Sequence, residues 1–167
     1  MTSQDNSIIY DFQSPQQNAL RWHVVNDGVM GGLSKSKIAL TDGGNGLFEG
    51  TITTENNGGF ASVKHSFFQK EVSQFNMVKL RIKGDGKSYQ FRIKSYEAQQ
   101  YSYVQEFKTS GEWQTITLYF DQFYASYRGN TLGRPNYDGK LIEEVTFLIG
   151  NKRNESFALE IERIWLE

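Results

Sequence analysis

The strongest constraint on the fold of this chain is an apolar–polar alternation with a period of two residues. In M-V-K-L-R-I-K, residues 77–83, Val78, Leu80 and Ile82 alternate with basic side chains, and Y-Q-F-R-I-K, residues 89–94, repeats the pattern. Successive side chains of a strand point to opposite faces of its sheet, so each segment is predicted to be a half-buried strand. The intervening G-D-G-K, residues 84–87, predicts that the two strands form an antiparallel hairpin.

Further strand-like runs cover most of the remaining chain, separated by Gly, Asn and Asp. Roughly ten short strands and few helical stretches predict an all-β fold, a β-sandwich of the jelly-roll type. We find no internal repeat, linker or break in composition, so residues 1–167 are predicted to form one domain. The longest irregular stretch, residues 125–140, is either a functional loop or an ordered crossover between the sheets. The other predicted strands are 22–26, 36–41, 47–54, 60–68, 101–108, 113–120, 145–150 and 157–166.

Composition narrows the classes of function. The formal net charge is -1 and the isoelectric point is about 6.2, which argues against a general nucleic-acid binder. The absence of cysteine excludes disulfides, thiolate zinc sites and cysteine nucleophiles. The N-terminal residues show no secretory signal, and no apolar run approaches the ~20 residues that span a bilayer. We therefore expect a cytoplasmic domain with no cofactor, no metal and no nucleic-acid partner.

Two glycine-rich stretches, N-D-G-V-M-G-G-L-S at 26–34 and E-N-N-G-G-F at 55–60, resemble ligand loops. Their spacing fits neither a phosphate loop, nor a dinucleotide fingerprint, nor a nucleophile turn. Glycine reaches positive φ and lets two backbones approach closely, and Asp side chains cap turns. We therefore predict a structural loop, made of Asp27, Gly28, Gly31, Gly32, Asn57, Gly58 and Gly59.

No catalytic residues are predicted. His23, Asp27 and Ser34 spell a hydrolase triad, but a chain of this length offers such triples by coincidence. Paired glutamates would suit glycoside hydrolysis if they faced each other in a cleft, yet solvated positions on strands explain them equally well. The chain is therefore expected not to be an enzyme.

Two groups of residues are candidates for binding a partner or ligand. If the 84–87 turn pairs its strands, Lys79, Arg81, Arg92 and Lys94 share one sheet face. That face is either a cross-strand charge ladder or a recognition surface for an acidic protein segment, a sugar phosphate or a membrane surface. Aromatic and polar side chains in the irregular stretch either stack on sugars or anchor a protein interface, or else fill a local loop core. These are Tyr127, Arg128 and Asn130.

Several motifs in one order resemble the complex I intermediate-associated protein 30 family. The resemblance begins with W-H-V-V-N-D-G-V-M-G-G-L-S and F-E-G-T-I-T-T-E-N-N-G-G-F-A-S-V and spans nearly the whole chain. Later matches are G-D-G-K-S-Y (84–89), S-Y-V-Q-E-F-K-T (102–109), E-W-Q-T-I-T-L-Y-F-D-Q-F (112–123), Y-R-G (127–129), I-E-E-V-T-F-L-I-G-N-K (142–152) and F-A-L-E-I-E-R-I (157–164).

The resemblance implies a galactose-binding-domain-like jelly roll without a defined catalytic set. It also implies a role like that of the eukaryotic members, which are mitochondrial assembly factors for respiratory complex I. The N-terminus lacks arginine and contains Asp5, which departs from a mitochondrial transit peptide and suggests a cytoplasmic relative.

We therefore expect a non-catalytic, chaperone-like assembly factor for a multisubunit complex, respiratory or photosynthetic. It would bind protein subunits of that complex and could make peripheral membrane contact. The alternative is a carbohydrate-binding module of the same fold, with a glycan ligand and a structural calcium ion held by Asp11, Asp42 or Glu162.

Overall fold

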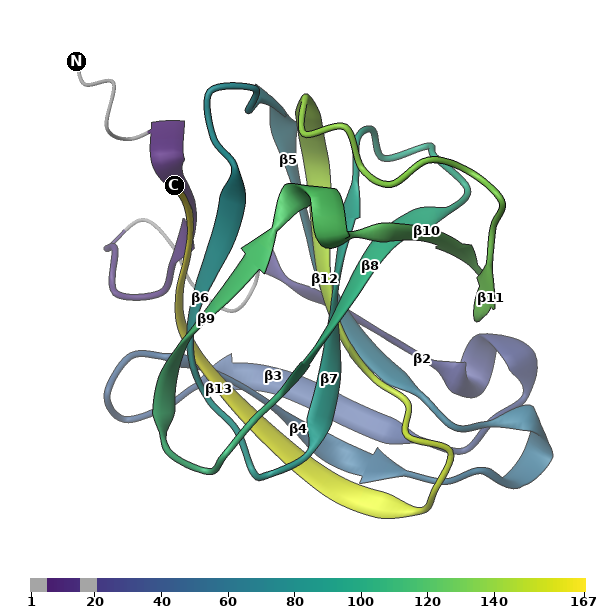
Figure 1. Cartoon of the computed structure of the whole chain (residues 1–167). Coiled ribbons are helices and arrows are strands. Elements are labelled where there is room, and N and C mark those ends of the chain that lie inside the picture. The colour runs from purple at the N-terminus through teal and green to yellow at the C-terminus, as the bar shows by residue number, and fades with distance from the viewer. Residues whose placement is uncertain (1–5, 16–20) are drawn as a thin grey trace.

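The computed structural model describes residues 6–15 and 21–167, and in this part of the chain it forms two sheets packed face to face (Figure 1). One sheet has six strands in the order β3-β4-β13-β6-β9, with β1 also paired to β13. The other has seven strands in the order β11-β10-β8-β7-β12-β5-β2. The predicted all-β jelly-roll sandwich is confirmed.

The bounds of the strands are as follows. The six-stranded sheet contains β1 (Ile8–Asp11), β3 (Lys35–Leu40), β4 (Gly46–Ile52), β6 (Met77–Lys83), β9 (Trp113–Tyr119) and β13 (Glu155–Leu166). The seven-stranded sheet contains β2 (His23–Asn26), β5 (Ala61–Glu71), β7 (Ser88–Lys94), β8 (Ser102–Lys108), β10 (Tyr124–Tyr127), β11 (Asn130–Thr131) and β12 (Leu141–Ile149). Short 3-10 turns cover η3 (Asp27–Met30), η4 (Glu55–Asn57) and η5 (Phe120–Gln122).

The core lies between the two sheets and is built from the apolar phase of each strand. Leu80 and Ile82 of β6 are fully buried, as are Phe91 and Ile93 of β7. At the centre, the Phe147 ring on β12 lies edge-on to Phe91, with ring centroids 5.1 Å apart. Burying these large side chains supplies most of the stabilising free energy of such a fold.

The hairpin predicted at residues 84–87 is wrong. Strand β6 pairs with β9 and β13, whereas β7 pairs with β8 and β12. Residues 84–87 therefore carry the chain from one sheet to the other. An alternating strand has the same sequence pattern whether its neighbour in sequence pairs with it or faces it across the core. Consequently Lys79 and Arg81 lie on the outer face of one sheet, and Arg92 and Lys94 on that of the other.

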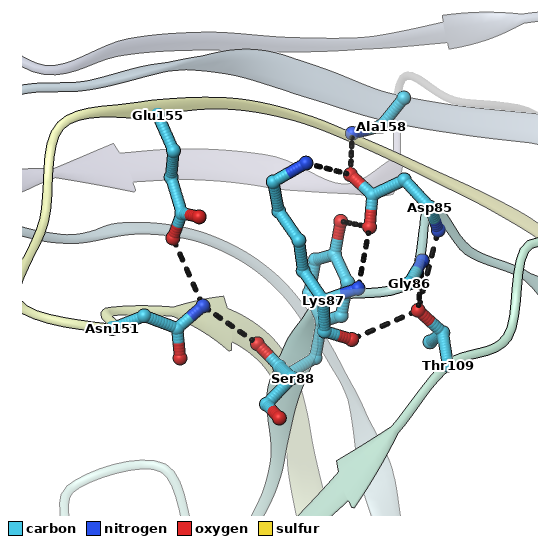
Figure 2. A network of polar contacts seen from close by, with 9 residues as sticks. Asp85, Gly86, Lys87, Ser88, Thr109, Asn151, Glu155 and Ala158 are labelled. Atoms are coloured by element: carbon cyan, nitrogen blue, oxygen red, sulfur yellow. Dashed lines mark hydrogen bonds and ion pairs between the residues drawn. The ribbon is translucent and has the colours of Figure 1, made fainter.

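Asp85 holds this crossing in place (Figure 2). One carboxylate oxygen accepts hydrogen bonds from the Tyr89 hydroxyl at 3.1 Å and the Lys87 amide at 3.2 Å. The other accepts from the Ala158 amide of β13 at 2.9 Å. The Asp85 carboxylate thus binds a backbone amide of β13 at a position beyond the end of β6. Burial and the neighbouring Asp85 carboxylate raise the pKa of Tyr89, so its hydroxyl remains a donor.

Thr109 completes the crossing from the end of β8. Its hydroxyl oxygen accepts from the amides of Asp85 (3.2 Å) and Gly86 (3.0 Å) and donates to the Lys87 carbonyl (2.8 Å) (Figure 2). A Cβ atom at Gly84 would lie 2.2 Å from the Cβ of Thr109. Glycine at this position therefore lets the threonine reach three backbone groups at once.

The stretch at 125–140 is more ordered than its composition indicates. It contains a hairpin of β10 and β11, with Arg128 (φ 49°) and Gly129 (φ 82°) at its two-residue turn. Positive φ at both positions matches the twist of the paired strands. Further along, the buried Tyr137 donates its hydroxyl to the Leu141 carbonyl at 2.7 Å.

Candidate functional site

The two glycine-rich stretches meet around Asp27, which is fully buried. Its carboxylate accepts hydrogen bonds from the amides of Ser34 (3.0 Å), Gly59 (2.7 Å) and Phe60 (3.3 Å), and from the Ser34 hydroxyl. The Ser34 oxygen also accepts from the Thr53 amide at 3.0 Å. One carboxylate thus joins the segment after β2 to the segment before β5.

The glycines fit around this carboxylate for two separate reasons. A Cβ atom at Gly32 would lie 2.4 Å from the Asp27 Cγ, and one at Gly58 would lie 2.5 Å from the Thr53 carbonyl oxygen. Gly31 and Gly59 have φ of +90° and +133°, which side chains disfavour. A Cβ atom at Gly28 would meet nothing within 4 Å, and Asn57 lies in η4. Other amides of the loop, those of Gly31 and Gly58, donate to the carbonyls of Gly28 and Glu55.

We expect the Asp27 carboxylate to make the free energy of unfolding depend on pH in the acidic range. Burial by itself raises the pKa of Asp27, but the hydrogen bonds from Ser34, Gly59 and Phe60 outweigh it and hold the pKa below its ordinary value. The unfolded chain therefore takes up the proton first, and the stability supplied by Asp27 is lost as pH falls from about 5 through the lowered pKa. Urea unfolding at about pH 6 and pH 3 checks this: the gap between wild type and Asp27→Asn should narrow at pH 3. An equal gap would contradict it.

The outer face of the seven-stranded sheet carries a polar surface centred on Arg92. In the register of the sheet, Arg92 lies opposite Val104 of β8 and Thr146 of β12. We call this surface the Arg92 face. Its residues are Gln90, Arg92, Lys94, Val104, Glu106, Tyr124, Glu144 and Thr146.

The charges on the Arg92 face are unevenly matched. Glu144 is 3% exposed, lies 3.9 Å from the Lys64 ammonium and 4.0 Å from that of Lys94, and accepts from the Ser66 hydroxyl. The Arg92 Nε and Nη2 atoms instead both donate to the Gln90 amide oxygen, at 3.0 and 2.7 Å. Among the described residues, Arg92 forms no ion pair with a carboxylate.

Desolvation makes this arrangement costly. Burial lowers the pKa of Arg92, with an opposing effect from Tyr124, yet an arginine remains charged at neutral pH. A partly buried cation satisfied only by a neutral amide retains unused capacity for an acceptor. The Arg92 face is therefore the candidate site at which a ligand with oxygen acceptors would gain most from Arg92.

The other predicted residues are distributed over three places. Lys94 lies on the Arg92 face but is paired with Glu144. Tyr127, Arg128 and Asn130 lie at the tip of the β10–β11 hairpin, at the edge of the same sheet, where all three are exposed. The Arg128 guanidinium lies 5.3 Å from the centroid of the Tyr127 ring. Lys79 and Arg81 are on the opposite side of the sandwich.

The sequence pattern did not reveal the roles of Gln90 and Glu144. Glu144 pairs with Lys94, whereas Gln90 leaves Arg92 without a carboxylate partner in the described part of the chain. The residues that the structure describes contain no group of three or more His, Asp or Glu side chains placed to hold a metal ion. In the same part of the chain, no helix is long and apolar enough to span a membrane.

Solved structures with the same fold include carbohydrate-binding modules. The family 11 module of the cellulosomal cellulase Lic26A-Cel5E of Clostridium thermocellum matches with a TM-score of 0.68 and 20% identity, over 95% of this chain and 92% of that one. A second structure of a family 11 module from this organism, in complex with a β-1,3-1,4-mixed-linked tetrasaccharide, matches with a TM-score of 0.66, 20% identity and coverage of 96% and 94%. At this identity the likeness establishes the fold.

A curated relative links the sequence to a named protein. The chain is 24% identical to Complex I intermediate-associated protein 30, mitochondrial, of Mus musculus, over 94% of this chain and 55% of the relative, so it spans about half of that protein's length. The family model for Complex I intermediate-associated protein 30 matches residues 10–161. The chain therefore belongs to the complex I intermediate-associated protein 30 family.

Proposed function

We propose that this domain is a non-catalytic assembly factor that binds a protein subunit of a larger, respiratory or photosynthetic complex through the Arg92 face. The observation that carries the proposal is the partly buried Arg92 cation, whose hydrogen bonds go to the neutral Gln90 amide. The name of the mouse relative supports a client among the subunits of a respiratory complex.

Arg92 suits the role of an anchor in such an interface. Arginine is enriched among the residues that dominate binding free energy, because its planar guanidinium forms several hydrogen bonds at once. Arg92 is already partly removed from water in the free domain, so binding adds little to its desolvation cost. New hydrogen bonds from the guanidinium to a carboxylate or carbonyl of the client therefore contribute most of their free energy to affinity. Tyr124, half-buried across Val104 from Arg92 in the sheet, adds an aromatic contact surface.

We expect Arg92→Gln to weaken client binding by about 2 kcal/mol, or roughly 30-fold. The test is a pull-down of the tagged chain from gently solubilised native cells, followed by mass spectrometry, with the affinity of the recovered subunit then measured in solution. Arg153→Gln, at an exposed arginine in the loop between β12 and β13, is the matched control. Undiminished affinity of the folded Arg92→Gln protein would overturn the assignment of this face.

Glycan binding is the second candidate function, favoured by the fold shared with the family 11 modules and by the polar groups of the Arg92 face. Calorimetry with a β-1,3-1,4-mixed-linked tetrasaccharide is a direct test. Saturable binding by wild type that Arg92→Gln removes would assign the face to a glycan in place of a protein. Stabilisation by calcium and not by magnesium would support the same assignment.

The compartment is part of the proposal. We propose a cytoplasmic location for this chain, whereas the mouse relative is named as mitochondrial. Fractionation of native cells, with detection of the untagged protein in each fraction, decides between the two.

A further inference from the structure

A surface rich in cations lies on the side of the sandwich opposite the Arg92 face. Arg81 of β6 and Arg163 of β13 stand directly opposite each other in the six-stranded sheet. Like charges in directly opposed positions repel and destabilise a sheet. We call this surface the Arg81 face. Its residues are Lys79, Arg81, Lys83, Trp113, Arg163 and Trp165.

Neighbouring aromatic rings orient both guanidinium groups. Arg163 lies 4.3 Å from the centroid of the Trp165 ring, and Arg81 lies 5.7 Å from that of Trp113. The Arg81 Nη1 atom also donates to the Thr115 hydroxyl at 3.3 Å. The Arg163 Nε atom is buried and, within the described residues, has no hydrogen-bond partner. Cation–π contacts place these groups but do not neutralise their charge.

Carboxylates that border this surface include Glu160, Asp11 and Glu167, the last of which accepts a hydrogen bond from the Trp165 indole at 2.8 Å. Glu160 lies opposite Lys83 in the register but accepts a hydrogen bond from the Asn45 amide at 2.9 Å. Asp11 of β1 lies opposite Arg163. Across residues 6–15 and 21–167, none of the four cations of the Arg81 face forms an ion pair with a carboxylate.

The spacing of the cations indicates the shape of the missing anion. Alternate residues of a strand are about 7 Å apart, so Lys79, Arg81 and Lys83 form a row of about 13 Å along β6. Alternate side chains of an extended peptide repeat at the same distance. A single phosphate would engage the arginine pair and leave the rest of the row unused. Trp113 and Trp165 add flat apolar surface of the kind that anchors protein interfaces.

We propose that the Arg81 face binds an acidic protein segment in extended conformation, with carboxylates at alternate positions. The central carboxylate receives hydrogen bonds from Arg81 and Arg163, and its neighbours pair with Lys79 and Lys83. This site is separate from the Arg92 face, so the domain can hold an acidic segment on one side and a client subunit on the other.

The proposal is tested by fluorescence anisotropy with the full chain. The probe is a labelled peptide of about 12 residues with glutamate at alternate positions, and glutamine replaces glutamate in its matched control peptide. Arg81→Gln combined with Arg163→Gln should weaken binding at least tenfold, whereas Arg153→Gln, at an exposed arginine outside both faces, should leave it unchanged. Affinity should fall as salt is raised from about 50 to 200 mM.

Stability measurements separate loss of the site from loss of the fold. Removing two opposed like charges relieves repulsion, so the double variant should have a Tm equal to or above that of wild type. Binding that survives the double substitution would overturn the proposal. So would equal affinity for the glutamine peptide, or binding of a single-stranded oligonucleotide in preference to the acidic peptide. If Arg92→Gln loses client binding but still binds the peptide, the two surfaces act separately, as the proposal requires.

Discussion

Asp27→Asn should lower the free energy of unfolding by about 3 kcal/mol, because asparagine cannot accept all the hydrogen bonds that the carboxylate accepts. Three amides and one hydroxyl donate to Asp27, and the side chain is fully buried. An asparagine amide nitrogen would point hydrogens at these donors and leave them unsatisfied. Hydrogen bonds to a charged group contribute more than neutral ones, which places the effect above that of an ordinary polar substitution.

Urea denaturation monitored by tryptophan fluorescence measures this effect. Asp42→Asn is the matched control, because Asp42 lies exposed in the loop after β3 and should change stability by less than about 0.5 kcal/mol. Neither the Arg92 face nor the Arg81 face includes Asp27 or a residue that donates a hydrogen bond to it. An Asp27→Asn protein that melts normally and loses ligand binding would show that the glycine loops are a binding site.

Asp85→Ala should cost about 3 kcal/mol of stability, because three donors lose their acceptor at the point where the chain changes sheets. The donors are the amides of Lys87 and Ala158 (Figure 2) and the Tyr89 hydroxyl. The tyrosine is 1% exposed, so its hydroxyl cannot turn to water. The Lys87 ammonium, 3.5 Å from the carboxylate, contributes little because this ion pair is partly solvated.

A double-mutant cycle with Tyr89→Phe resolves this contribution. Once the tyrosine hydroxyl is absent, replacing Asp85 leaves one fewer unsatisfied group, so the cost of Asp85→Ala should fall by about 1 kcal/mol. Urea unfolding of the four proteins provides the values. Strictly additive costs would show that the hydroxyl and the carboxylate do not stabilise each other.

The sequence predicts the buried side of each strand well but not its neighbours in the sheet. Alternation correctly placed Leu80 and Ile82 in the core, as well as Phe91 and Ile93. It contains no information on pairing, and a short Gly-Asp-Gly turn serves a crossing between sheets as readily as a hairpin. The decisive contact, from Asp85 to the Ala158 amide, joins residues that are 73 positions apart.

For the candidate surfaces too, the sequence predicts which side a residue faces but not which residues it contacts. Arg92 was correctly expected at an outward position, but its lack of a carboxylate depends on Gln90 and on where Glu144 directs its oxygens. Arg163 was missed, although the sequence carries a signal for it. The apolar phase of β13 runs through Ile161 and resumes at Ile164, which breaks the period of two. The register shift between Ile161 and Arg163 is the β-bulge that turns the arginine outward.

The position of β13 has a consequence for how the domain forms during synthesis. It is the last strand in chain order, yet it pairs with β4, β6 and β1, and the end of the chain lies beside β1 (Figure 1). Until β13 has left the ribosome, β4 and β6 lack the strand that joins them, and their apolar faces remain open to water. Unpaired strand edges therefore remain until the last strand of this domain has been synthesised, which is the condition under which chaperones bind and aggregation begins.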